Sequence, residues 1–241
     1  MIQQVARDFT MNEVLPVANE LDPQQGEIPM SLRDKMAEMR YFGIIVPEEY
    51  GGIGLGCFEY SLITEELARG WMSVASIIAR GNGVFGADTM SEEQRRKYLP
   101  RSASGEFLAA AALSEPDTGS DLSSISCRAR REGNEYVING NKYWCTFADG
   151  ADYIMLFART GEPPSQTRRH IGISGFIIEK ERGKLPPGVS GTPIPKIGYF
   201  GWKTWELSFD DCRVPANCLV GEEGKAFYIM ASGLEIARAH T

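Results

Sequence analysis

The spacing of apolar residues changes near Phe107, and this change limits the chain to a fold with separate helical and strand regions. From Val5 onward, apolar residues recur at helical intervals. After Phe107, short β-branched and aromatic runs between turn residues indicate about seven strands. Helical spacing returns after Gly221. We therefore predict the fold class α+β, with an N-terminal all-α domain (residues 1–106), an antiparallel β-barrel or sandwich domain (107–221) and the start of a C-terminal helical bundle (222–241).

Turn and capping signals predict where individual elements begin and end. The first helix runs to about Glu20, and Pro16 is expected to bend it. Ser31 is expected to cap the second helix. Ser91-Glu-Glu-Gln94 is a capping box that opens a short helix, which Pro100 should end. Asn139-Gly140 is the strongest hairpin signal in the chain.

Composition excludes several classes of function. Lys and Arg number 25 against 32 Asp and Glu, so the net charge of −7 argues against general affinity for nucleic acid or anionic membranes. Five scattered cysteines without a Cys-x-x-Cys pair suit reduced thiols better than a disulfide framework. The two histidines, His170 and His240, are too few and too distant in sequence to favour a zinc site or a Ser-His-Asp triad. No apolar run reaches the roughly 18 residues of a membrane span.

The segment Phe107–Asp121 has the composition of a ligand-binding strand end. Ala109–Ala112 would form a wall without bulky side chains, which leaves room for a large, flat ligand. Ser114 and Ser120 each offer a hydroxyl and a backbone N–H to one ligand. The same residues are also typical of an ordinary strand that ends in a Ser/Asp/Gly turn. Taken alone, this segment is compatible with both interpretations.

Five segments occur in the order found in one enzyme family, and together they span essentially the whole chain. The most specific is Leu-Ser-Glu-Pro followed by Gly-Ser-Asp. On these segments the sequence resembles the acyl-CoA dehydrogenase family. They are Val46–Leu55, Ser91–Gln94 with Lys97–Pro100, Leu113–Asp121, Tyr136–Thr146, and Phe209–Pro215 with Gly221–Phe227.

The resemblance implies a fold, a reaction and a cofactor. Family members have an N-terminal helical domain, a β domain and a C-terminal four-helix bundle, and FAD lies between the last two. They remove a proton from the α carbon of an acyl-CoA and transfer a hydride from the β carbon to the flavin. The resemblance therefore implies fatty acid metabolism, FAD, an acyl-CoA substrate, an electron-transfer flavoprotein as acceptor and a homo-oligomer (tetramer or dimer). It also implies the bacterial cytoplasm or the mitochondrial matrix, although no targeting peptide is visible.

The resemblance also assigns roles to individual residues. Leu113 would present its backbone to the flavin, the Ser114 hydroxyl would approach its N5 atom, and Ser120 would contact both the pyrophosphate and the acyl-CoA. Glu235 and Arg238 would lie at the acyl-CoA cleft. Without the resemblance, this pair would be a solvated ion pair one helical turn apart. The predicted cofactor residues are Ala111, Leu113, Ser114, Gly119, Ser120, Trp144, Cys145 and Thr146, and the predicted substrate residues are Ser120, Glu235 and Arg238.

Four positions depart from the family pattern or admit a second interpretation. Ala111 stands where many members have an aromatic residue, and Cys145 replaces the usual Ile or Val, so that its thiol either packs or reacts. Trp144 would be a core aromatic in the absence of the resemblance. Arg80 would either bind a polar or acidic acyl group or be a snorkelling or salt-bridged arginine.

No catalytic base is identifiable within these residues, and no metal site is predicted. Some members carry a catalytic Glu beside the arginine of the last helix, where this chain has Ala237. The base is then expected in the C-terminal region that follows, and the 241 residues alone are expected to be inactive. The alternative functions are a non-catalytic acyl-CoA-binding subunit or fragment and a flavin oxidase or monooxygenase of the same fold.

Overall fold

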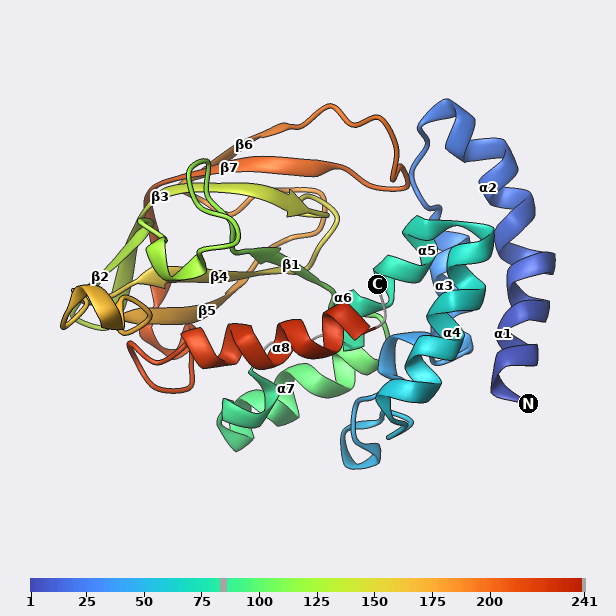
Figure 1. The fold of residues 1–241 in the computed structure, drawn as a ribbon, viewed down its shortest axis with the longest axis horizontal. Coiled ribbons are helices and arrows are strands. Elements are labelled where there is room, and N and C mark those ends of the chain that lie inside the picture. The colour runs from blue at the N-terminus through green and yellow to red at the C-terminus, as the bar shows by residue number, and fades with distance from the viewer. Residues whose placement is uncertain (83–85, 240–241) are drawn as a thin grey trace.

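The computed structural model describes residues 1–82 and 86–239, with side chains up to Leu234. Helices lie at one end of the molecule and a β-sheet at the other (Figure 1). Helix α8 contacts both β5 and α4, so it runs from the sheet to the helical end. The helices are α1 (Ile2–Phe9), α2 (Leu15–Leu21), α3 (Met30–Glu38), α4 (Cys57–Gly70), α5 (Met72–Ile77), α6 (Ala79–Asn82), α7 (Glu92–Ala103) and α8 (Phe227–Ala239); the strands are β1 (Ala109–Ala112), β2 (Arg128–Glu132), β3 (Glu135–Thr146), β4 (Tyr153–Arg159), β5 (Ile173–Glu179), β6 (Val189–Pro193), β7 (Thr204–Pro215) and β8 (Leu219–Val220).

Proline and capping signals locate the helix ends only in part. A π-helical turn, Thr10–Val14, joins α1 to α2, and it accommodates Pro16 in the first turn of α2. Pro29, not Ser31, caps α3, because its extended backbone directly precedes Met30. The capping box before α7 is confirmed by reciprocal hydrogen bonds of 3.1 Å between Ser91 and Gln94. Pro100 does not end α7, since its carbonyl still accepts a helical hydrogen bond from the N–H of Ser104.

The strands form one open, mixed sheet, which confirms the α+β class but not an all-antiparallel closed barrel. Its order is β6-β7-β3-β2-β4-β5-β8. Strand β1 pairs in parallel with β4 from Tyr153 to Leu156, and β2 meets the same edge of β4 at Arg159. Strands β1 and β2 therefore share one edge of β4, each pairing with a different part of it. Strand β1 also contacts β3.

The predicted turn at Asn139-Gly140 is wrong, because both residues lie inside β3. Strand β3 pairs with β2 on one edge and with β7 on the other, and its register to β7 shifts between Ile138 and Gly140. Gly140 has a φ of 141°, and an added Cβ would lie 2.7 Å from the Cα of Cys127. Asn-Gly here marks a β-bulge with a close backbone approach, both of which favour glycine.

A buried ion pair joins the end of β1 to β3. The Lys142 Nζ lies 2.9 Å from Glu115 Oε1, and both side chains are almost wholly buried. The same Nζ donates a hydrogen bond to the carbonyl oxygen of Leu113 at 2.9 Å. Glu115 also accepts hydrogen bonds from the backbone N–H groups of Ser126 (2.6 Å) and Cys127 (2.9 Å). These contacts fix the loop between β1 and β2 on both sides of its turn.

The charge of this pair is balanced by its surroundings. Burial raises the pKa of the Glu115 carboxyl, but the charge of Lys142 and the hydrogen bonds that Glu115 accepts lower it by more. The net effect holds the pKa of Glu115 below its usual value. Glu115 is therefore ionised in the folded protein at neutral pH.

Replacing Lys142 by Met should destabilise the protein by about 3–5 kcal/mol, because Glu115 would remain buried without its counter-charge. The free energy of unfolding from urea titration measures this loss. The control is Lys203→Met, which removes a half-exposed lysine paired with Glu27 and should cost less than about 1 kcal/mol. Equal losses for the two variants would contradict a central role of the buried pair.

The lowered pKa of Glu115 also predicts a pH dependence. A carboxyl whose pKa is lower in the folded state stabilises the protein above its unfolded-state pKa of about 4.3, and this stabilisation is lost as the pH falls. The stability advantage of the wild type over Glu115→Gln should therefore shrink when urea titrations are repeated from pH 7 toward acid. The control is Glu162→Gln, at an exposed carboxylate that pairs with Arg128, measured over the same pH range. A constant difference for Glu115→Gln would overturn the assignment.

Candidate functional site

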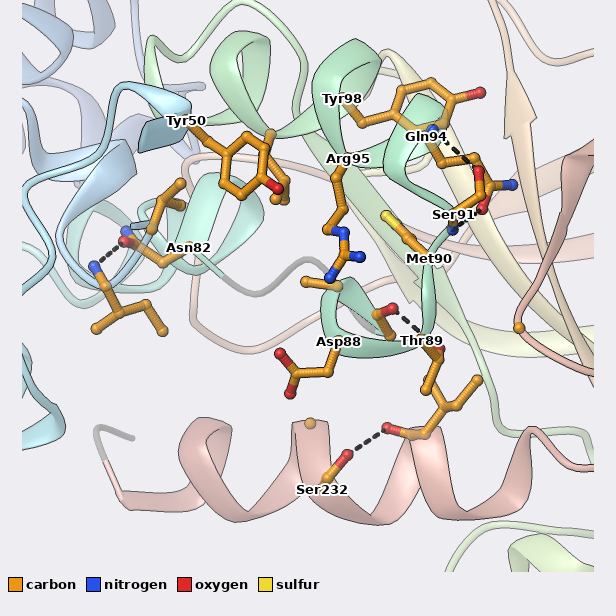
Figure 2. Close-up of a pocket in the computed structure, with 18 of the residues that line it drawn as sticks. Tyr50, Asn82, Asp88, Thr89, Met90, Ser91, Gln94, Arg95, Tyr98 and Ser232 are labelled. Atoms are coloured by element: carbon orange, nitrogen blue, oxygen red, sulfur yellow. Dashed lines mark hydrogen bonds between the residues drawn. The ribbon is translucent and has the colours of Figure 1, made fainter. Parts of the chain in front are cut away.

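Two adjoining cavities lie where the helices meet the sheet. The larger, of about 1660 Å³, is bounded by α7, α8 and the segment before α7. Figure 2 shows Arg95 reaching from α7 into this space beside Asp88, with Ser232 of α8 on the opposite side. The smaller cavity, of about 130 Å³, lies against the ends of β1 and β3. Arg80 and Ala111 line both cavities, so they stand at the junction.

The smaller cavity brings together five of the predicted cofactor residues. Two come from β3 and three from β1 and the residues after it, so the cavity depends on the approach of these two segments. The backbone N–H of Tyr143 donates a hydrogen bond of 2.8 Å to the carbonyl of Ser114, which joins the segments directly. The five residues are Ala111, Leu113, Ser114, Trp144 and Thr146.

Strand alternation explains why a single alanine of β1 reaches the cavity. Ala110 and Ala112 are buried in the core, whereas Ala111 faces the opposite side of the strand and is half-buried. Its methyl group occupies little of the space at the junction of the two cavities. Of Ala109–Ala112, which were predicted to form a wall without bulk, only Ala111 borders the cavity.

Trp144 is turned outward by an irregularity in β3. The register between β3 and β7 shifts between Lys142 and Cys145, and Trp144 has a φ of 60°. Such a backbone is strained for a bulky residue and requires support from its surroundings. The indole is 56% exposed, and its ring meets that of Tyr143 edge-on at 4.9 Å. The interpretation of Trp144 as a core aromatic is therefore wrong.

Three other predicted cofactor residues do not line either cavity. Cys145 is buried in the core, and burial raises the pKa of its thiol to about 12. Its side chain packs, and only its backbone lies between Trp144 and Thr146. Gly119 and Ser120 lie in an exposed bend of the loop after β1. Their roles toward a cofactor stay predictions.

The predicted substrate residues of the last helix are placed only by their backbone. Glu235 and Arg238 belong to α8, but their side chains lie outside the described residues. Across the described part of the chain, no cluster of metal-ligating side chains occurs. No helix among those residues has the length and apolar character needed to cross a membrane.

Sequence reasoning missed the residues that support the loop after β1. Glu115 and Lys142 both lie within segments that carry the family resemblance. The only local signal was a charged residue, Glu115, soon after an apolar strand. Arg159 was missed as well. Its guanidinium is buried and donates hydrogen bonds to the backbone carbonyls of Ser123, Ile125, Arg169 and Ile171.

Asp121 holds the exposed end of the same loop. Its carboxylate accepts hydrogen bonds from the hydroxyls of Ser123 and Ser124 and forms an ion pair with Arg169 at 2.8 Å. These hydrogen bonds and the nearby guanidinium lower the pKa of Asp121. The loop is therefore held at the core by Glu115 and at the surface by Asp121.

Comparison with known proteins agrees with this geometry. The family description "Acyl-CoA dehydrogenase, N-terminal domain" matches residues 1–106, and "Acyl-CoA dehydrogenase, middle domain" matches residues 110–212. The chain is 36% identical to the mitochondrial isovaleryl-CoA dehydrogenase of Pongo abelii, over 98% of this chain and 56% of that protein. It is 38% identical to the (2S)-methylsuccinyl-CoA dehydrogenase of Cereibacter sphaeroides, over 100% of this chain and 45% of that protein.

Solved structures show the same relationship. The acyl-CoA dehydrogenase from Geobacillus kaustophilus superposes with a TM-score of 0.87 at 34% identity, covering 98% of this chain and 61% of that one. The chain thus spans about half the length of the curated relatives it matches. The two domain matches, the relatives and the shared fold show that this chain belongs to the acyl-CoA dehydrogenase family.

Proposed function

We propose that the full-length protein is an FAD-dependent acyl-CoA dehydrogenase that converts an acyl-CoA thioester to the 2-enoyl-CoA and passes the electrons to an electron-transfer flavoprotein. The observation that carries this proposal is the small cavity, in which Ala111, Ser114 and Trp144 meet beside a much larger cleft. Family membership supports the class of reaction.

The residues of the small cavity fit an isoalloxazine ring system. Ala111 leaves space for a flat group, and the exposed indole of Trp144 offers an aromatic surface against which a ring can pack. Ser114 and Thr146 supply hydroxyl donors at the edge, and Leu113 supplies backbone groups. Bound FAD would supply a hydride acceptor for the β carbon of the substrate.

The larger cleft is the proposed acyl-CoA site. Its volume of about 1660 Å³ exceeds the roughly 300–1,000 Å³ of a drug-sized pocket, as a long ligand requires. Glu235 and Arg238 on α8 are proposed to contact the substrate, and Ser120 to lie near both ligands. We propose that the catalytic base is supplied from outside these 241 residues, and that the 241-residue chain alone does not turn over.

The assembly and location of the protein follow from the same proposal. We infer a homo-oligomer, a tetramer or a dimer, whose function belongs to fatty acid metabolism. Relatives come from bacteria and include proteins named as mitochondrial. We accordingly propose the cytoplasm in a bacterium and the mitochondrial matrix in a eukaryote.

Anaerobic addition of acyl-CoA to the yellow full-length protein should bleach the visible absorption of its flavin, because hydride transfer reduces the cofactor. An electron-transfer flavoprotein should then restore the colour. Colour that persists with every acyl-CoA would instead support a non-catalytic acyl-CoA-binding subunit. Rapid reoxidation by oxygen with stoichiometric peroxide would support a flavin oxidase.

Replacing Ser114 by Ala should weaken FAD binding roughly 2- to 10-fold, the range expected for loss of one hydrogen bond. Fluorescence titration of the full-length apoprotein with FAD measures the affinity. Ser190→Ala, on the exposed face of β6, is the matched control and should bind FAD like the wild type. If both variants bind FAD equally well, Ser114 does not contact the cofactor.

A further inference from the structure

Arg80 stands at the junction of the two cavities, and no carboxylate among the described side chains forms an ion pair with it. It lies on α6 and lines both the small cavity and the large cleft. Its Nε atom is buried, and among the described residues no hydrogen-bond acceptor meets it. The guanidinium lies over the ring of Trp202, with its Cζ 6.0 Å from the ring centroid. One face of the cation is thereby covered, and the phenol of Tyr199 makes a side-chain hydrogen bond with part of its edge. The other parts of the edge border the two cavities.

Within the part of the chain whose side chains are described, the groups that act on Arg80 are phenols rather than carboxylates. Tyr199, Tyr60 and Tyr153 are the residues whose oxygens act on the guanidinium, and burial lowers the pKa of Arg80 despite them. Burial also raises the pKa of Tyr60 and of Tyr153, so both phenols stay neutral at ordinary pH. By contrast, Arg95 in the same cleft has the carboxylate of Glu92 at 3.4 Å.

A desolvated guanidinium without an anion is costly in a folded protein. Arg33 is a second buried arginine with unpartnered nitrogens, but it packs over Phe147 and lines neither cavity. Arg80 differs because it borders open space. A guanidinium edge in a cavity is suited to a planar carboxylate, which accepts two parallel N–H hydrogen bonds.

We propose that Arg80 binds a carboxylate at the far end of the acyl group, so that the substrate is the CoA monothioester of a dicarboxylic acid. This inference rests on the proposed function, because it places the acyl group at the junction of the cavities. The phosphates of CoA are the other anions of such a ligand. Their cationic partners are available at other positions around the cleft, where Arg95, Lys97 and Lys225 line it.

Matched pairs of ligands test this assignment in the full-length holoenzyme. Succinyl-, glutaryl- and adipoyl-CoA differ from butanoyl-, pentanoyl- and hexanoyl-CoA only by a terminal carboxylate in place of a methyl group. Calorimetry should show that the wild type binds the carboxylated member of at least one pair more tightly. Tighter binding of the methyl member in every pair would overturn the proposal.

Arg80→Met should weaken binding of the preferred carboxylated ligand by about 10- to 100-fold and leave its methyl partner nearly unchanged. Arg80→Lys keeps the charge and should recover part of the loss. Arg130→Met removes an exposed arginine of β2 and serves as the control. Equal weakening of both ligands by Arg80→Met would instead assign Arg80 to CoA, to the flavin or to packing.

The two proposals fail in different ways. Calorimetry reports binding without turnover, so discrimination by Arg80 can be measured even if no ligand bleaches the flavin. Bleaching by the methyl ligands with no preference for a carboxylate would retain the dehydrogenase function and reject the role of Arg80. Carboxylate preference without bleaching would retain the Arg80 site and reject dehydrogenation.

Discussion

The buried ion pair between Lys142 and Glu115 is the contact on which the candidate site depends. It joins the loop after β1 to β3 across 27 positions of the chain. The lysine also donates a hydrogen bond to the carbonyl of Leu113, beside Ser114. A buried pair of this kind adds little net stability over an apolar pair, but breaking it is costly, so it specifies one arrangement of the loop.

The same electrostatic reasoning separates structural from ligand-binding charges. Lys142 and Arg159 are buried, and their N–H donors are met by a carboxylate or by backbone carbonyls. Arg80 is desolvated as well, yet it faces neutral phenols and open space. A buried cation with partners maintains the fold, whereas one that borders a cavity without an anion is available for a ligand.

Local patterns predicted the elements better than their boundaries. The capping box of Ser91 acts within one helical turn, so the start of α7 could be predicted from the four residues Ser91–Gln94. Pro100 and Asn139-Gly140 were misjudged because tertiary contacts outweigh their local preferences. Pro100 lies inside α7, where its carbonyl still accepts a helical hydrogen bond from Ser104. Asn139-Gly140 lies in β3, which pairs with β2 and β7 on its two edges. The direction of Trp144 depends on a register shift that periodicity cannot show.

By itself the sequence determined the α+β class, the family and five residues of the small cavity, because these follow from periodicity and from contiguous motifs. Only the tertiary structure decided that Lys142 is buried, that Cys145 packs in the core and that Arg80 stands between two cavities. The physical reason is that burial and charge pairing depend on residues brought together from distant segments. A side chain's neighbours along the chain do not specify them.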